Sequence, residues 1–294
     1  MSRPDWSVEG RDWPNRAASR FVDTGRMRWH VQVAGRGPVL LLLHGTGAAT
    51  HSWRALLPLL AEHFTVIAPD LPGHGFTTGR PSGGLSMVGI ARALGDLLTA
   101  LAVAPEWIVG HSAGAAIALR MAIDGVAAPR GVLGLNPALL PFPGLAAQLF
   151  PALARILFVN PFAPHIFAAM ARGPGEAARF LERSTGSRLD AAGVDLYRRL
   201  FATSDHCAGA LTMMAAWDLD TLSRDLPRIR VPLVFVTGDG DAAIPTASVQ
   251  EAAALIAGSR VEVLPGLGHL AHEEQPDLVA KLIEEFAQAT AGKA

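Results

Sequence analysis

The segment Gly110-His111-Ser112-Ala113-Gly114 places a serine in the pattern Gly-x-Ser-x-Gly. The apolar run Glu106–Gly110 before it predicts a strand, and the small-residue run Ala113–Ile123 after it predicts a helix. A serine held at such a sharp turn exposes its hydroxyl, and the flanking glycines let neighbouring elements approach closely. The pattern therefore predicts a nucleophile at Ser112, with a helix N-terminus directed at the negative charge that develops during attack.

A serine nucleophile needs a base and a carboxylate that orients the base. His269, in Gly266-Leu267-Gly268-His269, follows a predicted strand and precedes the last predicted helix. Asp241 follows another predicted strand, which gives the chain order nucleophile, acid, base. Asp239 is the rival acid, but it lies closer to the strand end, where aspartate often serves the turn. We expect Ser112, Asp241 and His269 to meet, because parallel strands end on one side of a sheet.

The stretch His44-Gly45-Thr46-Gly47 follows the predicted strand Val39–His44. A glycine-rich bend at this point can direct the backbone N–H of Thr46 towards the nucleophile. The N–H of Ala113, the residue after the serine, would be the second donor of an oxyanion hole. An ordinary glycine turn is the simpler interpretation of the same residues.

This glycine-rich stretch also imitates a dinucleotide-binding unit, with Asp70 at the end of the next predicted strand. The third glycine of that fingerprint is missing, because position 50 is Thr50. A nicotinamide-cofactor interpretation would also leave the serine turn and the Gly266–His269 turn unexplained. The remaining histidines show no metal-ligand spacing. We therefore expect neither a cofactor nor a metal.

Short apolar runs alternate with longer runs rich in alanine and leucine, which is typical of a mainly parallel sheet covered by helices on both faces. The predicted strands are Arg20–Asp23, Met27–Ala34, Val39–His44, Phe64–Asp70, Glu106–Gly110, Gly131–Asn136, Pro232–Gly238 and Arg260–Leu264. The predicted helices are His51–His63, Leu85–Leu101, Ala113–Ile123 and Pro276–Ala289.

The alternation stops over residues 137–225, which contain helical patches and no convincing strand. We interpret this segment as a helical cap inserted over the carboxyl edge of the sheet, where open α/β sheets bind their ligands. The expected organisation is an N-terminal extension (1–19), a core made of 20–136 and 226–294, and the cap.

The composition limits the function further. The chain has 294 residues, half of them apolar, and a net charge of −1, which gives no basic footprint for nucleic acid. Its one cysteine, Cys207, excludes a disulfide framework and fits a cytoplasmic protein. The polar first 20 residues lack the apolar core of a signal peptide, and no uninterrupted apolar run is long enough for a transmembrane helix.

These motifs, in this order, resemble the α/β-hydrolase family over residues 20–290. The serine at the turn differs from the aspartate of haloalkane dehalogenases and epoxide hydrolases. A narrower resemblance is to the BchO-type magnesium-chelatase accessory proteins of bacteriochlorophyll biosynthesis in photosynthetic bacteria. It rests on Arg11-Asp12-Trp13-Pro14-Asn15-Arg16, on the run from His44 to Trp53, and on Gly110–Ala116. The resemblance implies a role in the tetrapyrrole pathway and magnesium chelatase as a partner.

The stretch Ala138–Ala171 is apolar on nearly every face. It could pack on the core, line a wide pocket for a porphyrin-sized ligand with Met213, Met214 and Trp217, or contact a membrane surface peripherally. Our first hypothesis is a cofactor-independent hydrolase of an ester or related carbonyl in an apolar substrate. Our second is a non-catalytic porphyrin-binding or chelatase accessory protein. Carbon–carbon bond cleavage by the same triad is a third.

Overall fold

The computed structural model describes residues 2–141, 162–173 and 175–292. These residues form one nine-stranded sheet in the order β1-β2-β4-β3-β6-β7-β8-β9, with β5 paired to β2. The pairs that include β1 or β2 are antiparallel, and the others are parallel. The strands are β1 (Ser19–Asp23), β2 (Met27–Ala34), β3 (Val39–Leu43), β4 (Thr65–Pro69), β5 (Thr78–Gly79), β6 (Trp107–His111), β7 (Gly131–Leu135), β8 (Leu233–Gly238) and β9 (Arg260–Leu264).

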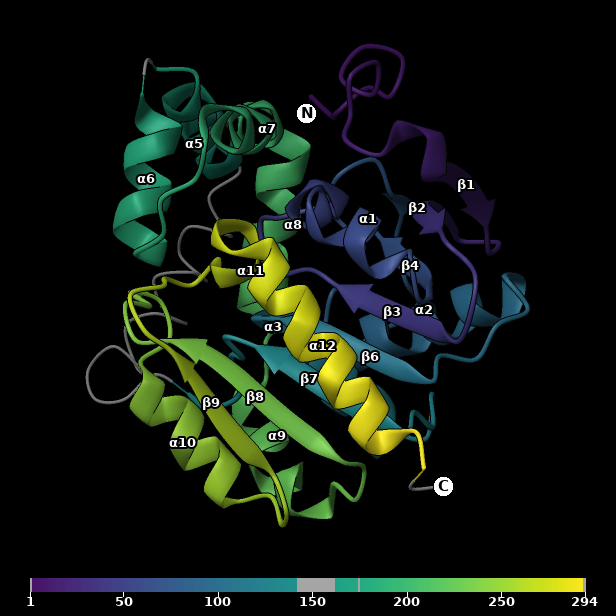
Figure 1. The fold of residues 1–294 in the computed structure, drawn as a ribbon. Coiled ribbons are helices and arrows are strands. Elements are labelled where there is room, and N and C mark those ends of the chain that lie inside the picture. Colours follow the sequence, from purple (N-terminus) through teal and green to yellow (C-terminus); the bar gives the residue numbers. More distant parts are fainter. Residues whose placement is uncertain (1, 142–161, 174, 293–294) are drawn as a thin grey trace.

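Helices cover both faces of this sheet. One apolar cluster joins α2 and α3 to the sheet, and another joins α1 and α12 to its opposite face. Figure 1 shows α12 lying across the near face of the sheet. The helices of the core are α1 (Leu56–Leu60), α2 (Met87–Ala100), α3 (Ala113–Ile123), α10 (Thr246–Ala254), α11 (Ala271–Glu274) and α12 (Pro276–Thr290), with the short 3-10 helices η1 (Arg16–Ala18) and η2 (Thr50–Trp53). The predicted fold class is confirmed.

The central strands are apolar along their whole length. Every residue of β6, β7 and β8 is buried, because helices pack on both faces of this part of the sheet. All eight predicted strands are present within one or two residues of the predicted bounds. The sequence did not reveal the two-residue strand β5 or helix α10.

The predicted helix His51–His63 is wrong, because the segment forms η2 and the short helix α1. Pro58 has no N–H to donate to the carbonyl of Arg54, so it fits only in the first turn of a helix, and α1 begins at Leu56 and not at His51. The carbonyl of Arg54 instead accepts a hydrogen bond from Asn15 Nδ2 at 3.1 Å. The N-terminal segment thus uses the carbonyl that the proline leaves free.

Between β7 and β8 the described residues contain helices and no strand. They are α5 (Ala163–Ala171), α6 (Glu176–Thr185), α7 (Ala191–Phe201), α8 (Ser204–Ala215), α9 (Leu219–Asp225) and the 3-10 helix η3 (Leu226–Arg228). In Figure 1, α5 to α8 gather at the end of the sheet where the parallel strands finish. Most of the apolar stretch Ala138–Ala171 lies outside the described residues. No helix in the described ranges is long and apolar enough to cross a membrane.

The N-terminal segment, residues 2–18, is anchored by aromatic and charged side chains. Trp13 is buried and donates its indole N–H to Thr50 Oγ1 at 3.0 Å. Trp6 packs edge-on against Phe21 and Phe76. Asp12 binds Arg199 of α7 at 2.6 Å. The Asp-Trp-Pro-Asn-Arg sequence thus joins the sheet to the helical segment between β7 and β8.

Helix α8 approaches the backbone of the Asp70–Gly75 loop at Gly209. A Cβ on Gly209 would lie 1.8 Å from the carbonyl oxygen of Gly73. We predict that Gly209→Ala lowers the free energy of unfolding by about 1–3 kcal/mol, since the backbone must shift. Gly95→Ala is the control, because only the tip of Val126 lies near and alanine favours the helix. Equal denaturation midpoints for Gly209→Ala and the wild type would contradict the packing.

Most of the histidines are buried, and burial lowers the pKa of six of them. Of the ten in the chain, only His63 and His165 are exposed. Burial lowers the pKa of His206 to about 4 and that of His272 to about 3. Burial is also the main cause that lowers the pKa values of four others, which are His44, His51, His74 and His111.

These shifts predict acid lability. Unfolded imidazoles take up protons as the pH falls through about 6.5, whereas the buried ones resist until a lower pH. The unfolded state therefore binds more protons, and the free energy of unfolding falls as the pH drops from about 7 towards 4. We expect a lower melting temperature at pH 5 than at pH 8 in calorimetry.

A single substitution can test how much one buried histidine contributes to this pH dependence. His51 makes no hydrogen bond to any described residue through either ring nitrogen. His51→Phe should therefore reduce the loss of melting temperature at pH 5, whereas the exposed His63→Gln should leave it unchanged. A melting temperature equal at both pH values in the wild type would refute the account.

Candidate active site

Ser112 lies at the turn between β6 and α3 with a backbone conformation that L-residues rarely adopt. Its φ is 50° and its ψ is −115°. A Cβ on Gly114 would lie 2.1 Å from the carbonyl oxygen of Leu43, and one on Gly110 would lie 2.5 Å from the Ala115 backbone. Both flanking glycines are therefore required by close packing, and the turn places Ser112 at the carboxyl edge of the sheet.

His269 and Asp241 meet at this same edge. His269 Nδ1 lies 2.8 Å from Asp241 Oδ2, and the Asp241 side chain is 1% exposed. The other oxygen, Oδ1, accepts the backbone N–H groups of Ala243 at 2.7 Å and Ile244 at 2.8 Å. Because a carboxylate can only accept, His269 carries its proton on Nδ1 and leaves Nε2 free to accept one.

Asp239, the rival acid, has a different task. Its Oδ1 accepts the N–H of Gly266 at 2.7 Å, and the residue is exposed. It closes the turn that leads into the His269 loop. Geometry therefore brings Asp241, and not Asp239, to the imidazole.

Ser112 is linked to the His269–Asp241 pair through its neighbour in the chain, His111. Among the described hydrogen bonds, none joins the Ser112 hydroxyl to His269. His111, the residue before Ser112, contacts His269: its Nε2 lies 2.9 Å from the carbonyl oxygen of His269, and the two ring centroids are 4.7 Å apart. Catalytic hydrogen bonds are often long in free enzymes and shorten when substrate binds.

Thr46 lies in the loop that faces Ser112. A Cβ on Gly45 would lie 3.1 Å from Ser112 Cβ, so this loop passes directly against the serine. Ala113 is the first residue of α3. Within the described part of the chain, the N–H groups of Thr46 and Ala113 donate to no backbone carbonyl. Neither donor is thus used by the described residues at this edge.

Asn136 and Glu274 also belong to this site, although no sequence motif pointed to them. Asn136 follows β7 and donates from Nδ2 to Asp241 Oδ2 at 2.8 Å. Glu274 Oε2 accepts the N–H of Gly268 at 2.9 Å, next to His269. The position of Asn136 directly after an apolar strand was an available signal, since such residues share the edge with Ser112.

Glu273, to which no sequence motif pointed either, is the centre of a buried polar network. Its carboxylate accepts the Ser52 hydroxyl at 2.8 Å and the Tyr197 hydroxyl at 2.7 Å, and it forms an ion pair with Arg54. Burial raises the pKa of the Glu273 carboxyl, against the opposing effect of Arg54. The network ties η2, α7 and the segment after His269 together.

His44 and Cys207 are two further buried residues that could have been reactive. His44 binds loop backbone, with Nδ1 2.8 Å from the carbonyl oxygen of Gly45 and Nε2 accepting the N–H of Leu71 at 2.9 Å. Cys207 is buried, and burial raises the pKa of its thiol to about 11, which makes it a poor nucleophile.

The dinucleotide interpretation fails at Asp70. This carboxylate is fully buried and accepts the backbone N–H groups of Thr50 at 2.7 Å and Phe76 at 2.8 Å, with His30 Nδ1 at 2.8 Å. Because it is fully buried, this carboxylate is not accessible to a ribose hydroxyl.

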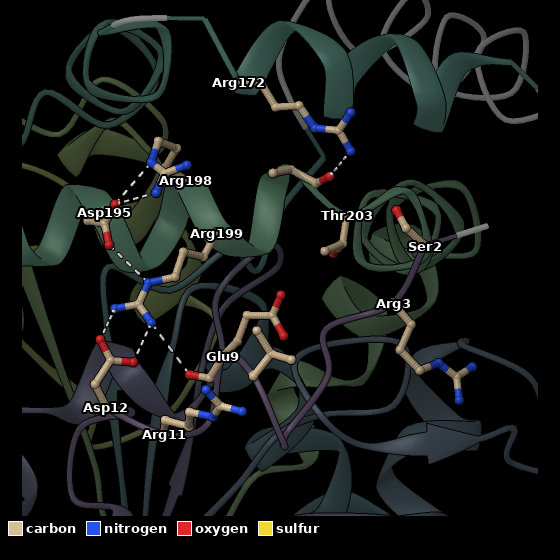
Figure 2. Close-up of a pocket in the computed structure, with 12 residues that line it drawn as sticks. Ser2, Arg3, Glu9, Arg11, Asp12, Arg172, Asp195, Arg198, Arg199 and Thr203 are labelled. Atoms are coloured by element: carbon tan, nitrogen blue, oxygen red, sulfur yellow. Dashed lines mark hydrogen bonds and ion pairs between the residues drawn. The ribbon is translucent and has the colours of Figure 1, made fainter.

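A cavity of about 690 Å³ lies between the N-terminal segment and α7, away from Ser112 (Figure 2). Its charged side chains largely neutralise one another. Arg199 binds Asp12 at 2.6 Å and Asp195 at 2.9 Å, and Arg198 also binds Asp195. Arg3, on its rim, pairs with Asp205. We therefore interpret the cavity as part of the junction that anchors the N-terminal segment.

Comparisons with known proteins agree with this geometry. The model of the alpha/beta hydrolase family matches residues 40–282. The magnesium-chelatase 30 kDa subunit of Rhodobacter capsulatus is 38% identical over 94% of this chain and 97% of its own. A 2-hydroxy-6-oxo-6-(2'-aminophenyl)hexa-2,4-dienoic acid hydrolase of Metapseudomonas resinovorans is 28% identical over 92% of this chain and 89% of its own.

Solved structures show the same architecture. A thermophilic esterase from Thermogutta terrifontis superposes with a TM-score of 0.73 at 22% identity, over 92% of this chain and 98% of that one. With the family model, the sheet order and the serine turn in agreement, the chain belongs to the alpha/beta hydrolase family and is a homologue of the magnesium-chelatase 30 kDa subunit.

Proposed function

We propose that the chain is a serine hydrolase in which Ser112, Asp241 and His269 act as a catalytic triad. The hydrogen bond between His269 Nδ1 and Asp241 Oδ2, at the sheet edge that carries Ser112, is the observation that supports this proposal most strongly. A scaffold without chemistry has no need of a buried carboxylate aligned on an imidazole beside a strained serine.

The reaction follows from the hydrogen-bonding roles. His269 Nε2 takes the proton of the Ser112 hydroxyl as its oxygen attacks a carboxylic ester or related carbonyl. The N–H groups of Thr46 and Ala113 stabilise the oxyanion. His269 then protonates the leaving alcohol, and water, activated by the same imidazole, releases the acyl group and restores Ser112. No cofactor enters any step.

We further propose that residues 137–225 form a cap over the site and that the substrate is apolar. The name of the Rhodobacter capsulatus relative supports a tetrapyrrole-linked ester and magnesium chelatase as a partner. Trp217 and Met214, at least partly exposed, would form adaptable apolar walls. The exposed Ile166 and Met170 of α5 would face the photosynthetic membrane if the protein, otherwise cytoplasmic, contacts that membrane peripherally.

A second candidate is a non-catalytic chelatase accessory or porphyrin-binding protein. It is favoured by the name of the same relative, which describes a subunit and not a reaction. Under this proposal Ser112 is dispensable for function.

A fluorophosphonate probe, located by peptide mass spectrometry, tests the triad. We predict labelling confined to Ser112, abolished in Ser112→Ala. His269→Ala should lower the labelling rate by at least about 10³-fold, and Asp241→Asn by about 10³–10⁴-fold, because the imidazole loses its required tautomer.

Asp239→Asn is the matched control, since this exposed carboxylate serves only the neighbouring turn, and its labelling rate should stay within a few-fold of the wild type. Unlabelled but folded wild-type protein would refute the hydrolase proposal. Full pathway function in Ser112→Ala, with porphyrin or chelatase binding retained, would establish the accessory role.

A further inference from the structure

Helix α8 contacts two loops at the edge of the sheet through one buried side chain, His206. Its Nδ1 accepts the N–H of Gly75 at 3.1 Å, and its Nε2 lies 3.0 Å from the carbonyl oxygen of Gly47. An N–H can only donate and a carbonyl can only accept, so Nε2 carries the proton and donates to Gly47. His206 therefore joins the loop after β3 to the loop after β4 in a single tautomer.

The imidazole stays neutral over the working pH range. Burial lowers the pKa of His206 to about 4, against opposing effects of the Gly47 carbonyl, Asp70 and Asp205, while His44 lowers it further. Because the ring does not charge near neutral pH, both hydrogen bonds persist there.

Thr46 is held on both sides by such contacts. The carbonyl of Gly45 lies 2.8 Å from His44 Nδ1, and the carbonyl of Gly47 accepts His206. The Thr46 hydroxyl donates to the sulfur of Met213 at 3.6 Å. The Gly45 carbonyl and the Thr46 N–H belong to one planar peptide, so His44 fixes the direction of this N–H from one side. His206 anchors the backbone on the other side, at Gly47, and so limits how far the loop around Thr46 can rotate.

The contacts come from one face of α8. His206, Gly209 and Met213 are spaced at i, i+3 and i+7, which places them in one row. Gly209 brings the helix against the backbone of Gly73, so the two side chains on either side of it reach the loop after β3.

We propose that His206 is a positioning residue that directs the Thr46 N–H towards the oxyanion formed at Ser112. The inference rests on the proposed function and extends it, since it assigns part of the preorganisation of the oxyanion hole to a helix outside the sheet. An oxyanion donor is effective only when its direction is set before the reaction.

The test compares His206→Leu and His206→Gln with the wild type on p-nitrophenyl acyl esters. His206→Leu removes both hydrogen bonds, so kcat should fall about 10–100-fold while KM stays within about twofold, because the lost interaction acts on the transition state. Affinity for a boronic acid that binds Ser112 should fall in parallel. His206→Gln retains an amide donor and acceptor and should recover part of the loss.

Cys207→Ala is the matched control, because this buried residue of α8 donates to the carbonyl of Phe201 and no hydrogen bond among the described residues joins its side chain to the loop after β3. Its kcat should equal that of the wild type. Amide hydrogen exchange over residues 44–50 should be faster in His206→Leu and unchanged in Cys207→Ala.

The two proposals fail in different ways. Wild-type protein that neither hydrolyses esters nor labels at Ser112 would overturn the proposed function and this inference with it. If the wild type is active and a folded His206→Leu variant has the same kcat, the inference alone is overturned. The same holds if Cys207→Ala loses as much kcat as His206→Leu. If His206→Leu fails to fold, the same comparison is made with His206→Gln: a fall in kcat with KM nearly unchanged supports the inference, and an unchanged kcat overturns it.

Discussion

The backbone of Ser112 keeps a conformation that costs roughly 1–3 kcal/mol, and the surrounding structure must hold it there. Its N–H donates to the carbonyl of Leu135 at 2.9 Å, and its carbonyl accepts the N–H of Ala115 at 3.1 Å and that of Ala138 at 3.3 Å. Gly114 lies against the carbonyl of Leu43. The strained turn is thus fixed from β3, β7 and α3 together, and nearly all the residues of these elements are buried. A well-packed centre of the sheet is what keeps the serine at its edge.

The buried carboxylates around this turn are each supplied with partners. Asp241 receives two backbone N–H groups, Asn136 and His269. Glu273 receives two hydroxyl groups and a guanidinium. An unpaired carboxylate in such surroundings would be costly, so these partners also specify the loop conformations that deliver them. The directions of the side chains at the edge therefore follow from satisfying buried acceptors as much as from apolar packing.

The helical segment between β7 and β8 is attached to the core by similar directional contacts. Tyr197 of α7 reaches Glu273, Arg199 of α7 binds Asp12 of the N-terminal segment, and His206 of α8 reaches Gly47 (Figure 2 shows the Arg199 side). Apolar contacts are non-directional and do not by themselves select one rotation of a helix. Hydrogen bonds at fixed positions do, which explains how an inserted segment keeps a constant orientation towards the site.

Local patterns in the sequence were enough to determine the strands, the serine turn and the order of the candidate catalytic residues. Apolar runs with glycine at their ends depend only on neighbouring residues, so Ser112 and His269 could be assigned to loops at one edge of the sheet. Pro58 shows the limit of such local patterns. Its effect on the predicted helix is local, but it leaves the Arg54 carbonyl free to accept a hydrogen bond from Asn15, which lies far away in the chain.

Only the tertiary structure decided which polar groups meet. Asp241 and Asp239 are two residues apart and of the same residue type, yet one binds His269 and the other closes a turn. Glu273 and Tyr197 are separated by 76 residues and carry no pattern that links them. The reason is physical: a hydrogen bond depends on distances and angles of a few ångströms and degrees, which are set by how whole elements pack and not by the residues beside each partner.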